Sequence, residues 1–412
     1  MPKVPAALLE RPFRFQFLAS TSSVIGDNLV SVALAFAILE LTGSASDLGL
    51  VLAARTVTLV IFLLLGGVWA DRVPRQRLMM LSDLGRASTQ GALAFLVISG
   101  RAELWHFVIL EALNGAATAF FFPAQAGLTP KTVSRERLQQ ANALLSLSHS
   151  SAGIAGPILA GILVATVGAG WALAIDAITF LVSAGFLLQI KLPALAQKIE
   201  RTTLLADVAK GWAEVRSRQW LWISILNFMT FQLLALPAFF VLGPFISERS
   251  FGGAGAWAAI VAAAGIGSII GDLASMKIEP ERPLRAAYLS MLLAPPVLVL
   301  LGIEAPVWAI AIAAVPWGIS MTFFNTLWYT VLQVHVPDES LSRVSSYDWL
   351  GSTALRPLGF AFVGPVAVWL GTAQTLIAVA VVITLVEIST AFIPSIATLS
   401  RDPSTEAVPS AP

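Results

Sequence analysis

Three ionisable residues stand inside long apolar stretches of this sequence, where a charge is costly. Asp27 lies in "SVIGDNLV", Arg55 in "LAARTVTLV" and Glu111 in "VILEALNG". A carboxyl group in dry surroundings holds its proton more tightly, and a neighbouring arginine loosens it again. We therefore predict that Asp27 and Glu111 compete for Arg55 and that one of them takes up a proton. The alternative is a static ion pair that only holds helices together.

The composition identifies the kind of element that carries these charges. The chain has 412 residues, of which 57% are hydrophobic and 12% charged, whereas a soluble chain has about a quarter of its residues charged. Charge-poor blocks such as 154–175 and 366–386 exceed the roughly 20 residues that a helix needs to cross a bilayer. The sequence thus predicts an all-α integral membrane protein.

Glycine, proline and charge divide the chain into twelve apolar segments, and we predict two pseudo-symmetric six-helix bundles. The predicted domains are an N-terminal bundle over 1–190, a cytoplasmic linker over 191–219, a C-terminal bundle over 220–395 and a disordered cytoplasmic tail over 396–412. The predicted spans are 13–39, 47–70, 78–99, 104–128, 138–167, 170–190, 220–246, 254–275, 285–302, 306–333, 342–369 and 372–394.

The basic residues indicate the orientation. With the N-terminus inside, the 25 Lys and Arg residues fall on the cytoplasmic side, apart from Arg101 and Arg249 outside and three arginines within spans. Positive charge favours the inner side. We expect a multi-pass protein of the bacterial inner (cytoplasmic) membrane with both termini cytoplasmic, and a first span that stays as an uncleaved anchor.

A weak internal repeat appears when the sequence is shifted by 203 positions. The segment 120–138 then lies over 323–341, and Gly156 and Gly161 meet Gly359 and Gly364. Both segments follow the fourth span of their half. Two parallel halves with a site at mid-depth are typical of transporters.

A charged turn, "GGVWADRVPRQR", follows the second span at 66–77. Its pattern of Gly67, Asp71 and Arg72 followed by Arg75 and Arg77 resembles the cytoplasmic loop signature of the major facilitator superfamily, with proline at 74 where the family usually has glycine. The resemblance implies a conformational lock in which Asp71 pairs across the two halves. We expect Asp83 and Arg86, three apart on the third span, to join this lock, unless they only anchor that span.

The fifth span contains Gly153, Gly156, Pro157 and Gly161 in "GIAGPILAG". Small residues at this spacing let helices approach closely, and proline bends the span. The pattern is similar to the antiporter signature of the same superfamily. The stretches "IGDNLVSVAL", "GGVWADR" and "AIDAITFLVSA" further resemble its drug and siderophore exporter branch, which includes macrolide efflux pumps and enterobactin exporters.

The resemblance implies a secondary active efflux transporter that exchanges protons for a small amphipathic molecule, such as a drug, siderophore or natural product, by alternating access. A facilitator or importer of a small metabolite and a non-transporting, receptor-like relative are the alternatives. Aromatic and amide side chains suit such a cargo, although an aromatic stripe also packs against neighbours. The substrate-cavity candidates are Asn28, Asn227, Phe231, Gln232, Trp317, Phe324, Asn325 and Trp328.

Other chemistries find little support. The chain has no cysteine and three scattered histidines, and it lacks the HExxH, GxSxG and GxxxxGK[ST] motifs. We expect no enzyme activity, no metal, no cofactor and no nucleic acid; the expected partners are substrate, protons and the lipid bilayer, and the expected state is a monomer. Asp176 and Glu387 are interpreted as structural.

Overall fold

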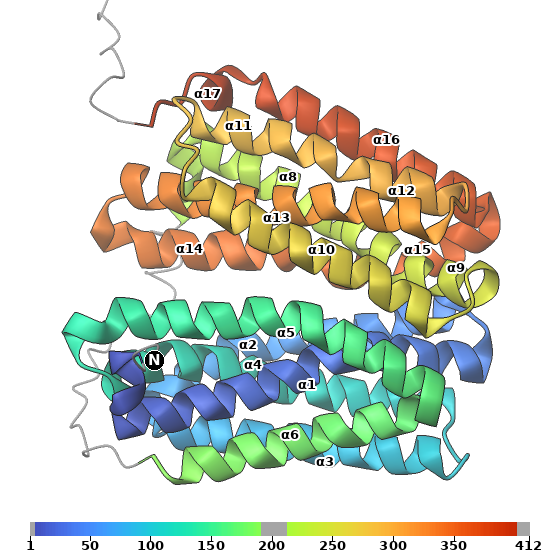
Figure 1. Cartoon of the computed structure of the whole chain (residues 1–412). Coiled ribbons are helices and arrows are strands. Elements are labelled where there is room, and N and C mark those ends of the chain that lie inside the picture. The colour runs from blue at the N-terminus through green and yellow to red at the C-terminus, as the bar shows by residue number, and fades with distance from the viewer. Residues whose placement is uncertain (1–4, 191–211, 402–412) are drawn as a thin grey trace, which may run out of the picture. The chain divides into compact units, whose positions relative to one another are not determined.

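The computed structural model describes residues 5–190 and 212–401, except for the side chains of 64–72, 126, 139, 338–343 and 346. Every regular element of the described chain is a helix (Figure 1). The predicted linker lies mostly outside the described residues. Of the predicted tail over 396–412, residues 396–401 are described, and Arg401 N–H donates to the carbonyl of Glu281 at 3.1 Å.

The first half contains six long helices, two of them preceded by short 3₁₀ turns. The 3₁₀ turns are η1 (Ala6–Leu9) and η2 (Arg135–Arg137). The long helices are α1 (Arg11–Thr42), α2 (Ala45–Arg72), α3 (Arg75–Ile98), α4 (Leu104–Thr132), α5 (Leu138–Val167) and α6 (Ala169–Leu188).

The second half is more interrupted, because prolines begin several of its helices. The elements are α8 (Gln219–Pro237), the π-helical turn η3 (Ala238–Leu242), α9 (Gly243–Ser250), α10 (Ala254–Ser275), α11 (Pro283–Ser290), η4 (Met291–Leu293), α12 (Pro295–Gly302), α13 (Val307–His335), α14 (Asp338–Thr353), α15 (Arg356–Leu370), α16 (Thr372–Ala391) and α17 (Pro394–Ala397). Pro283, Pro295 and Pro357 stand at the first or second position of α11, α12 and α15, where a missing N–H costs least.

Eleven stretches of the described chain are long and apolar enough to cross a membrane. The one predicted span that is not among these eleven stretches is 78–99, the third along the chain, which corresponds to α3. This helix forms as predicted but has too low a hydropathy, because Asp83, Arg86 and Gln90 lie on it and are buried. Its polar residues face protein rather than lipid. The all-α fold with about twelve spans is thereby confirmed.

The bounds of two pairs of helices agree with the repeat register of 203 residues. Helix α4 starts at Leu104 and ends at Thr132, and α13 starts and ends 203 positions later; α6 and α16 show the same offset at both ends. Gly168 and Gly371, also 203 apart, precede α6 and α16 with φ of 91° and 96°, a conformation that favours glycine.

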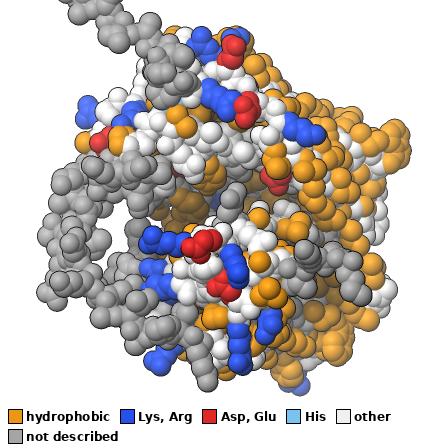
Figure 2. Space-filling model, turned by 60° about the vertical axis from the view of Figure 1, so that its left-hand side comes forward, with side chains coloured by type: hydrophobic (Ala, Val, Ile, Leu, Met, Phe, Trp, Pro, Cys, Tyr) orange, Lys and Arg blue, Asp and Glu red, His pale blue; other side chains and the backbone are white. Residues whose placement is uncertain are grey.

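The described chain forms two compact units. The first holds α1 to α6 together with Val241–Ala262 and Phe360–Pro365, and the second holds the rest of the described chain from α8 onwards. In each unit, charged side chains gather at the end that faces forward in Figure 2, and hydrophobic side chains cover the flank. This distribution suits helices that cross a bilayer lengthwise.

Close helix approaches in the first unit bring the polar side chains together. A Cβ added to Gly115 of α4 would lie 2.1 Å from the carbonyl oxygen of Arg55 on α2, and Thr58 Oγ1 donates to the carbonyl of Ala112 at 2.6 Å. A Cβ on Gly156 of α5 would lie 2.5 Å from Cβ of Asn28 on α1. These contacts hold α2 against α4 and α1 against α5.

Candidate functional site

The strongest polar contact of the first unit joins α1 to α3. Arg86 Nη2 donates to both carboxylate oxygens of Asp27 at 2.5 Å. The same guanidinium donates through Nη1 to Ser23 Oγ at 3.1 Å, and its carbon lies 3.9 Å from the ring centroid of Phe180 on α6. Arg86 is 2% exposed, whereas Asp27 is 29% exposed. The pair therefore connects a buried cation to a carboxylate that water can reach.

Arg55 on α2 stands between two carboxylates. Its Nη1 lies 3.3 Å from Oε2 of Glu111 on α4, and its Nη2 lies 3.8 Å from Oδ1 of Asp27. Gln90 Nε2 on α3 donates to the other oxygen of Glu111 at 2.8 Å. Glu111 is 1% exposed, so its charge depends on Arg55 and Gln90 rather than on water.

Asp83 completes the set on the buried side. Ser183 Oγ on α6 donates to Asp83 Oδ2 at 2.5 Å, and Arg86 Nη1 lies 3.4 Å from Asp83 Oδ1. Asp83 is fully buried. We call Asp27, Arg55, Asp83, Arg86 and Glu111 the charged network; its members come from α1, α2, α3 and α4.

The charged network opens into a cavity of about 290 Å³ in the first unit. Asp27 and Arg55 form part of its wall, beside the polar side chains of Asn28, Gln125 and His149. The remaining wall is Val24, Leu59, Thr118, Phe121 and Phe122. A cavity that combines apolar side chains with charged and polar groups can bind an amphipathic molecule.

The structure brings Asp27, Arg55 and Glu111 together, as the sequence predicts, but it changes their pairing. From the sequence we predict that both carboxylates pair with Arg55 and that Asp83 and Arg86 join a cytoplasmic lock. In the structure Arg86 is the main partner of Asp27, and it lies eleven residues into α3, about 16 Å from the start of the helix. Asp83 and Arg86 both belong to the charged network.

Several side chains of this site were not predicted from the sequence. Gln90 stands four residues after Arg86 and seven after Asp83, so all three share one face of α3. This periodicity could have revealed Gln90. By contrast, Ser183 and Gln125 are ordinary polar residues of apolar helices, and His149 is one of three scattered histidines. Their positions in the site depend on helix packing.

The predicted substrate-cavity residues of the second unit are mostly buried in its interior. Phe231, Trp317, Phe324 and Trp328 are at most 5% exposed. Phe231 and Phe239 contact the Trp317 ring, with centroids 6.0 and 4.7 Å apart. This packing accounts for the aromatic stripe without a substrate, so its role in binding stays a prediction.

The polar candidates of the second unit differ from one another. Asn227 is 6% exposed and donates to Thr390 Oγ1 on α16 at 3.0 Å, while Gln232 is 5% exposed. Trp328 Nε1 donates to Asp348 Oδ2 at 2.9 Å. Asn325 on α13 is exposed. Like the aromatic candidates, these residues keep only a predicted role.

The predicted lock is described in part. Gly67, Asp71 and Arg72 lie in the last turns of α2, and their side chains are outside the described residues. The guanidinium of Arg75 packs against Gly127 of α4, since a Cβ added to Gly127 would lie 1.7 Å from Arg75 Nη1. Arg77 is exposed. In the predicted antiporter motif, Gly156 contacts Asn28 as described above, and Gly153, Pro157 and Gly161 lie on the same helix.

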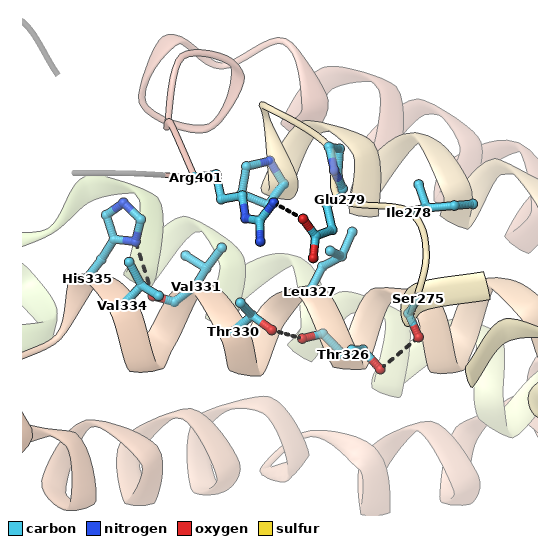
Figure 3. Close-up of a pocket in the computed structure, with 12 residues that line it drawn as sticks. Ser275, Ile278, Glu279, Thr326, Leu327, Thr330, Val331, Val334, His335 and Arg401 are labelled. Carbon is cyan, nitrogen blue, oxygen red and sulfur yellow. Dashed lines mark hydrogen bonds and ion pairs between the residues drawn. The ribbon is translucent and has the colours of Figure 1, made fainter. Parts of the chain in front are cut away.

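Two further cavities lie in the second unit. One of about 110 Å³ lies between α13 and the loop after α10, and the pair of Glu279 and Arg401 stands beside it (Figure 3). The other, of about 510 Å³, has Trp212, Trp222, Tyr347 and Arg216 in its wall. Neither has the buried arginine–carboxylate pairs that distinguish the first cavity.

Comparison with known proteins decides the family. The sequence model of the Major Facilitator Superfamily matches residues 16–359. The chain belongs to the Major Facilitator Superfamily. It is therefore a multi-pass membrane transporter rather than an enzyme, and the predicted membership of this superfamily is confirmed.

Relatives within the superfamily include named exporters. The enterobactin exporter EntS of Escherichia coli O1:K1 / APEC is 27% identical over 367 residues, which cover 86% of this chain and 86% of that protein. The uncharacterized MFS-type transporter YfiS of Bacillus subtilis (strain 168) is 30% identical over 215 residues; the match covers 49% of this chain and 50% of that protein. Thus this chain spans about half the length of YfiS.

Solved structures of the superfamily share the fold. A bacterial homologue of the human lysosomal transporter Spinster, in an inward-facing and unoccupied conformation, has a TM-score of 0.72 at 16% identity, over 93% of this chain and 96% of that one. The nucleoside transporter NupG has a TM-score of 0.70 at 13% identity, over 93% and 97%. At these identities the likeness concerns the fold alone.

Proposed function

We propose that this transporter exports a small amphipathic molecule in exchange for protons. The observation that carries the proposal is the Asp27–Arg86 pair, in which a water-accessible carboxylate is bound to a buried guanidinium at the edge of an apolar cavity. The named exporter EntS, similar over most of this chain, supports the outward direction. A facilitator or importer and a receptor-like relative are the alternatives.

Competition for the two arginines provides the coupling. When Asp27 is ionised, it holds Arg86 and approaches Arg55; when it takes up a proton, it loses most of its attraction for both. Arg55 can then bind Glu111 more closely, since the two atoms of that pair are already 3.3 Å apart. Protonation thus changes the contacts between α1, α3 and α2, which is what a proton-driven change between two states requires.

The cavity supports binding of a molecule with apolar and polar parts. Phe121, Phe122 and Leu59 provide an apolar surface, and Asn28, Gln125 and His149 provide hydrogen-bonding groups. A cationic or hydrogen-bonding part of a substrate placed at Asp27 competes with Arg86 for the same oxygens. Substrate and proton would then exclude each other at Asp27, as an antiporter needs. The lock predicted at Asp71 would bias the same two states.

Everted membrane vesicles with an imposed pH gradient test the proposal. A panel of dyes, macrolides and siderophores is scored for gradient-driven accumulation, and counterflow is measured without a gradient. Asp27→Asn and Glu111→Gln should abolish gradient-driven accumulation and keep counterflow. Glu387→Gln, which changes a buried carboxyl of the second unit, is the matched control and should keep both. Full gradient-driven accumulation in both test variants would refute the assignment.

A further inference from the structure

A fourth carboxyl beside the charged network has no hydrogen-bonding partner of its own. Asp176 on α6 is fully buried, and both of its carboxylate oxygens lack a hydrogen bond among the described residues. An isolated buried carboxylate is costly enough that such a group takes up a proton instead. From the sequence we interpret this residue as structural, but packing alone does not explain a buried carboxyl without hydrogen bonds.

Asp176 lies directly against the residue before Asp27. A Cβ added to Gly26 on α1 would be 2.2 Å from Asp176 Oδ1. One helical turn further along α6, Phe180 stacks on the Arg86 guanidinium at 3.9 Å. Asp176 therefore lies on the buried side of the Asp27–Arg86 pair, and the exposed side of that pair faces the cavity.

Charged side chains from four helices act on Asp176. Asp27 on α1, Arg86 on α3, Arg55 on α2 and Glu111 on α4 all act on it electrostatically. On α3, Asp83 lies 3.4 Å from Arg86. From α5, His149 lines the cavity beside Asp27. Asp176 is thus one member of a larger cluster of charges.

The cluster contains more acids than bases. Asp27, Asp83, Glu111 and Asp176 are four carboxyls, and Arg55 and Arg86 are two guanidiniums, which stay charged. A low-dielectric region does not tolerate the excess negative charge of four ionised carboxylates. We therefore expect protons on some of these groups, and Asp176 forms no hydrogen bond to a cation among the described residues.

The second half of the chain shows that the fold does not need a carboxyl at this place. The repeat register puts Val379 of α16 at the position equivalent to Asp176, and Val379 is 9% exposed. The same helix arrangement is thus built without a carboxyl at this place, which argues for a role in transport rather than in packing.

We propose that Asp176 is a second proton-carrying carboxyl, which exchanges its proton with Asp27 while Arg86 moves from one to the other. In the structure Asp27 is the carboxylate bound to Arg86, and the proposal assigns the proton to Asp176. In the exchange, the O–H bond of Asp176 breaks, an O–H bond forms on Asp27, and Arg86 then pairs with the Asp176 carboxylate. The number of protons and the total charge stay constant.

The proposal rests on proton coupling but is tested by a separate measurement. Infrared spectra of the purified full-length protein in lipid nanodiscs report the carbonyl stretch of protonated carboxylic acids. At neutral pH we expect a band in the unsubstituted protein that disappears in Asp176→Asn, and remains in Glu387→Gln. Asp176→Val, which copies Val379, provides a second variant if the amide does not fold.

A pH titration of that band tests the exchange itself. In the unsubstituted protein the Asp176 band should weaken as the pH rises, because a proton passed to Asp27 can leave to the water of the cavity. In Asp27→Asn the band should be weak already at neutral pH, because the neutral amide leaves Arg86 free to pair with the Asp176 carboxylate. A spectrum unchanged by Asp176→Asn would overturn the proposal, as would a band that never responds to pH. So would full gradient-driven accumulation in both Asp176 variants.

The outcome also separates this inference from the proposed function. If Asp27→Asn abolishes gradient-driven accumulation while the Asp176 variants keep it, proton coupling stands and the role of Asp176 fails. If the unsubstituted protein accumulates no substrate under any gradient, the proposed function fails, and the infrared titration still decides whether Asp176 exchanges a proton with Asp27.

Discussion

Arg86 of α3 bonds both carboxylate oxygens of Asp27 on α1 through one nitrogen at 2.5 Å, across 59 positions of the sequence. Because the arginine is 2% exposed and the aspartate 29% exposed, the pair links the interior of the first unit to its cavity. Both proton-linked proposals above follow from this asymmetry. It also makes Arg86 the residue on which the stability of the site should depend most.

Removing Arg86 should therefore destabilise the protein strongly. Arg86→Met leaves Asp27 and Asp83 without their common cation, and breaking a buried pair in this way costs about 3–5 kcal/mol. Arg86→Lys keeps the charge but cannot reach Asp27, Ser23 and Asp83 from one planar group, so we expect an intermediate loss. Thermal unfolding in detergent measures both. Arg101→Met, at an exposed loop arginine, is the control and should change stability little; equal losses for Arg86 and Arg101 would contradict the prediction.

The close contact of α5 with α1 predicts that Gly156 cannot be enlarged. An added Cβ would lie 2.9 Å from the backbone carbon of Asn28 and 3.1 Å from the nitrogen of Leu29, and backbone atoms cannot move aside cheaply. Gly156→Ala should cost about 1–3 kcal/mol by overpacking. Gly185→Ala on α6 is the matched control, because nothing lies within 4 Å of its added Cβ, and it should be neutral or slightly stabilising. Unfolding temperatures that fall equally would refute this reading of the contact.

The aromatic stripe of α13 should contribute to stability more than to binding. Phe324 is 1% exposed and contacts the rings of Phe228 and Tyr288, with centroids 5.2 and 5.1 Å away. Phe324→Ala should lower stability by about 3–5 kcal/mol and leave the substrate affinity of the folded protein unchanged. Tyr329→Ala on the same helix, at a residue 50% exposed, should alter stability little. An affinity loss without a stability loss at Phe324 would restore the substrate-facing interpretation.

The ion pair of Glu279 and Arg401 makes the attachment of the last described residues to the loop after α10 sensitive to acid. The hydrogen bond and charge of Arg401 lower the pKa of Glu279 below its usual 4.5. A lowered carboxyl pKa means that the contact is fully present above pH 4.5 and is lost as the pH falls through the lowered value. Since both side chains are exposed, salt should weaken it too.

Spin labels can measure this contact, because the chain has no native cysteine. Labels at introduced cysteines replacing Thr398 and Ile278 should show a broader distance distribution in acid and in Glu279→Gln. The backbone bond from Arg401 to the carbonyl of Glu281 remains, so loosening rather than release is expected. Glu304→Gln, at an acidic residue of another loop, is the control. A distribution that is the same at neutral and acidic pH would argue against a role for the ion pair.

The sequence by itself determined the helices and their repetition. Apolar blocks of membrane-spanning length predicted the spans, since burying backbone groups in a bilayer requires helices. The offset of 203 between Gly156 and Gly359 proved to be the offset between α4 and α13 as well. The sequence also marked Asp27, Arg55 and Glu111 as exceptional, because a charge within an apolar block is visible without any structure.

The tertiary structure decided which charges meet. Spacing along one helix reveals which residues share its face, but not the rotation of that helix against its neighbours. Because of that rotation, Asp27 pairs mainly with Arg86 rather than with Arg55. The rotation of α13 likewise turns the side chains of Trp317, Phe324 and Trp328 toward the protein interior. Helix packing also left the Asp176 carboxyl without a hydrogen bond to any described residue. Pairing between helices depends on close approaches such as Gly156 on Asn28, which only the packed fold specifies.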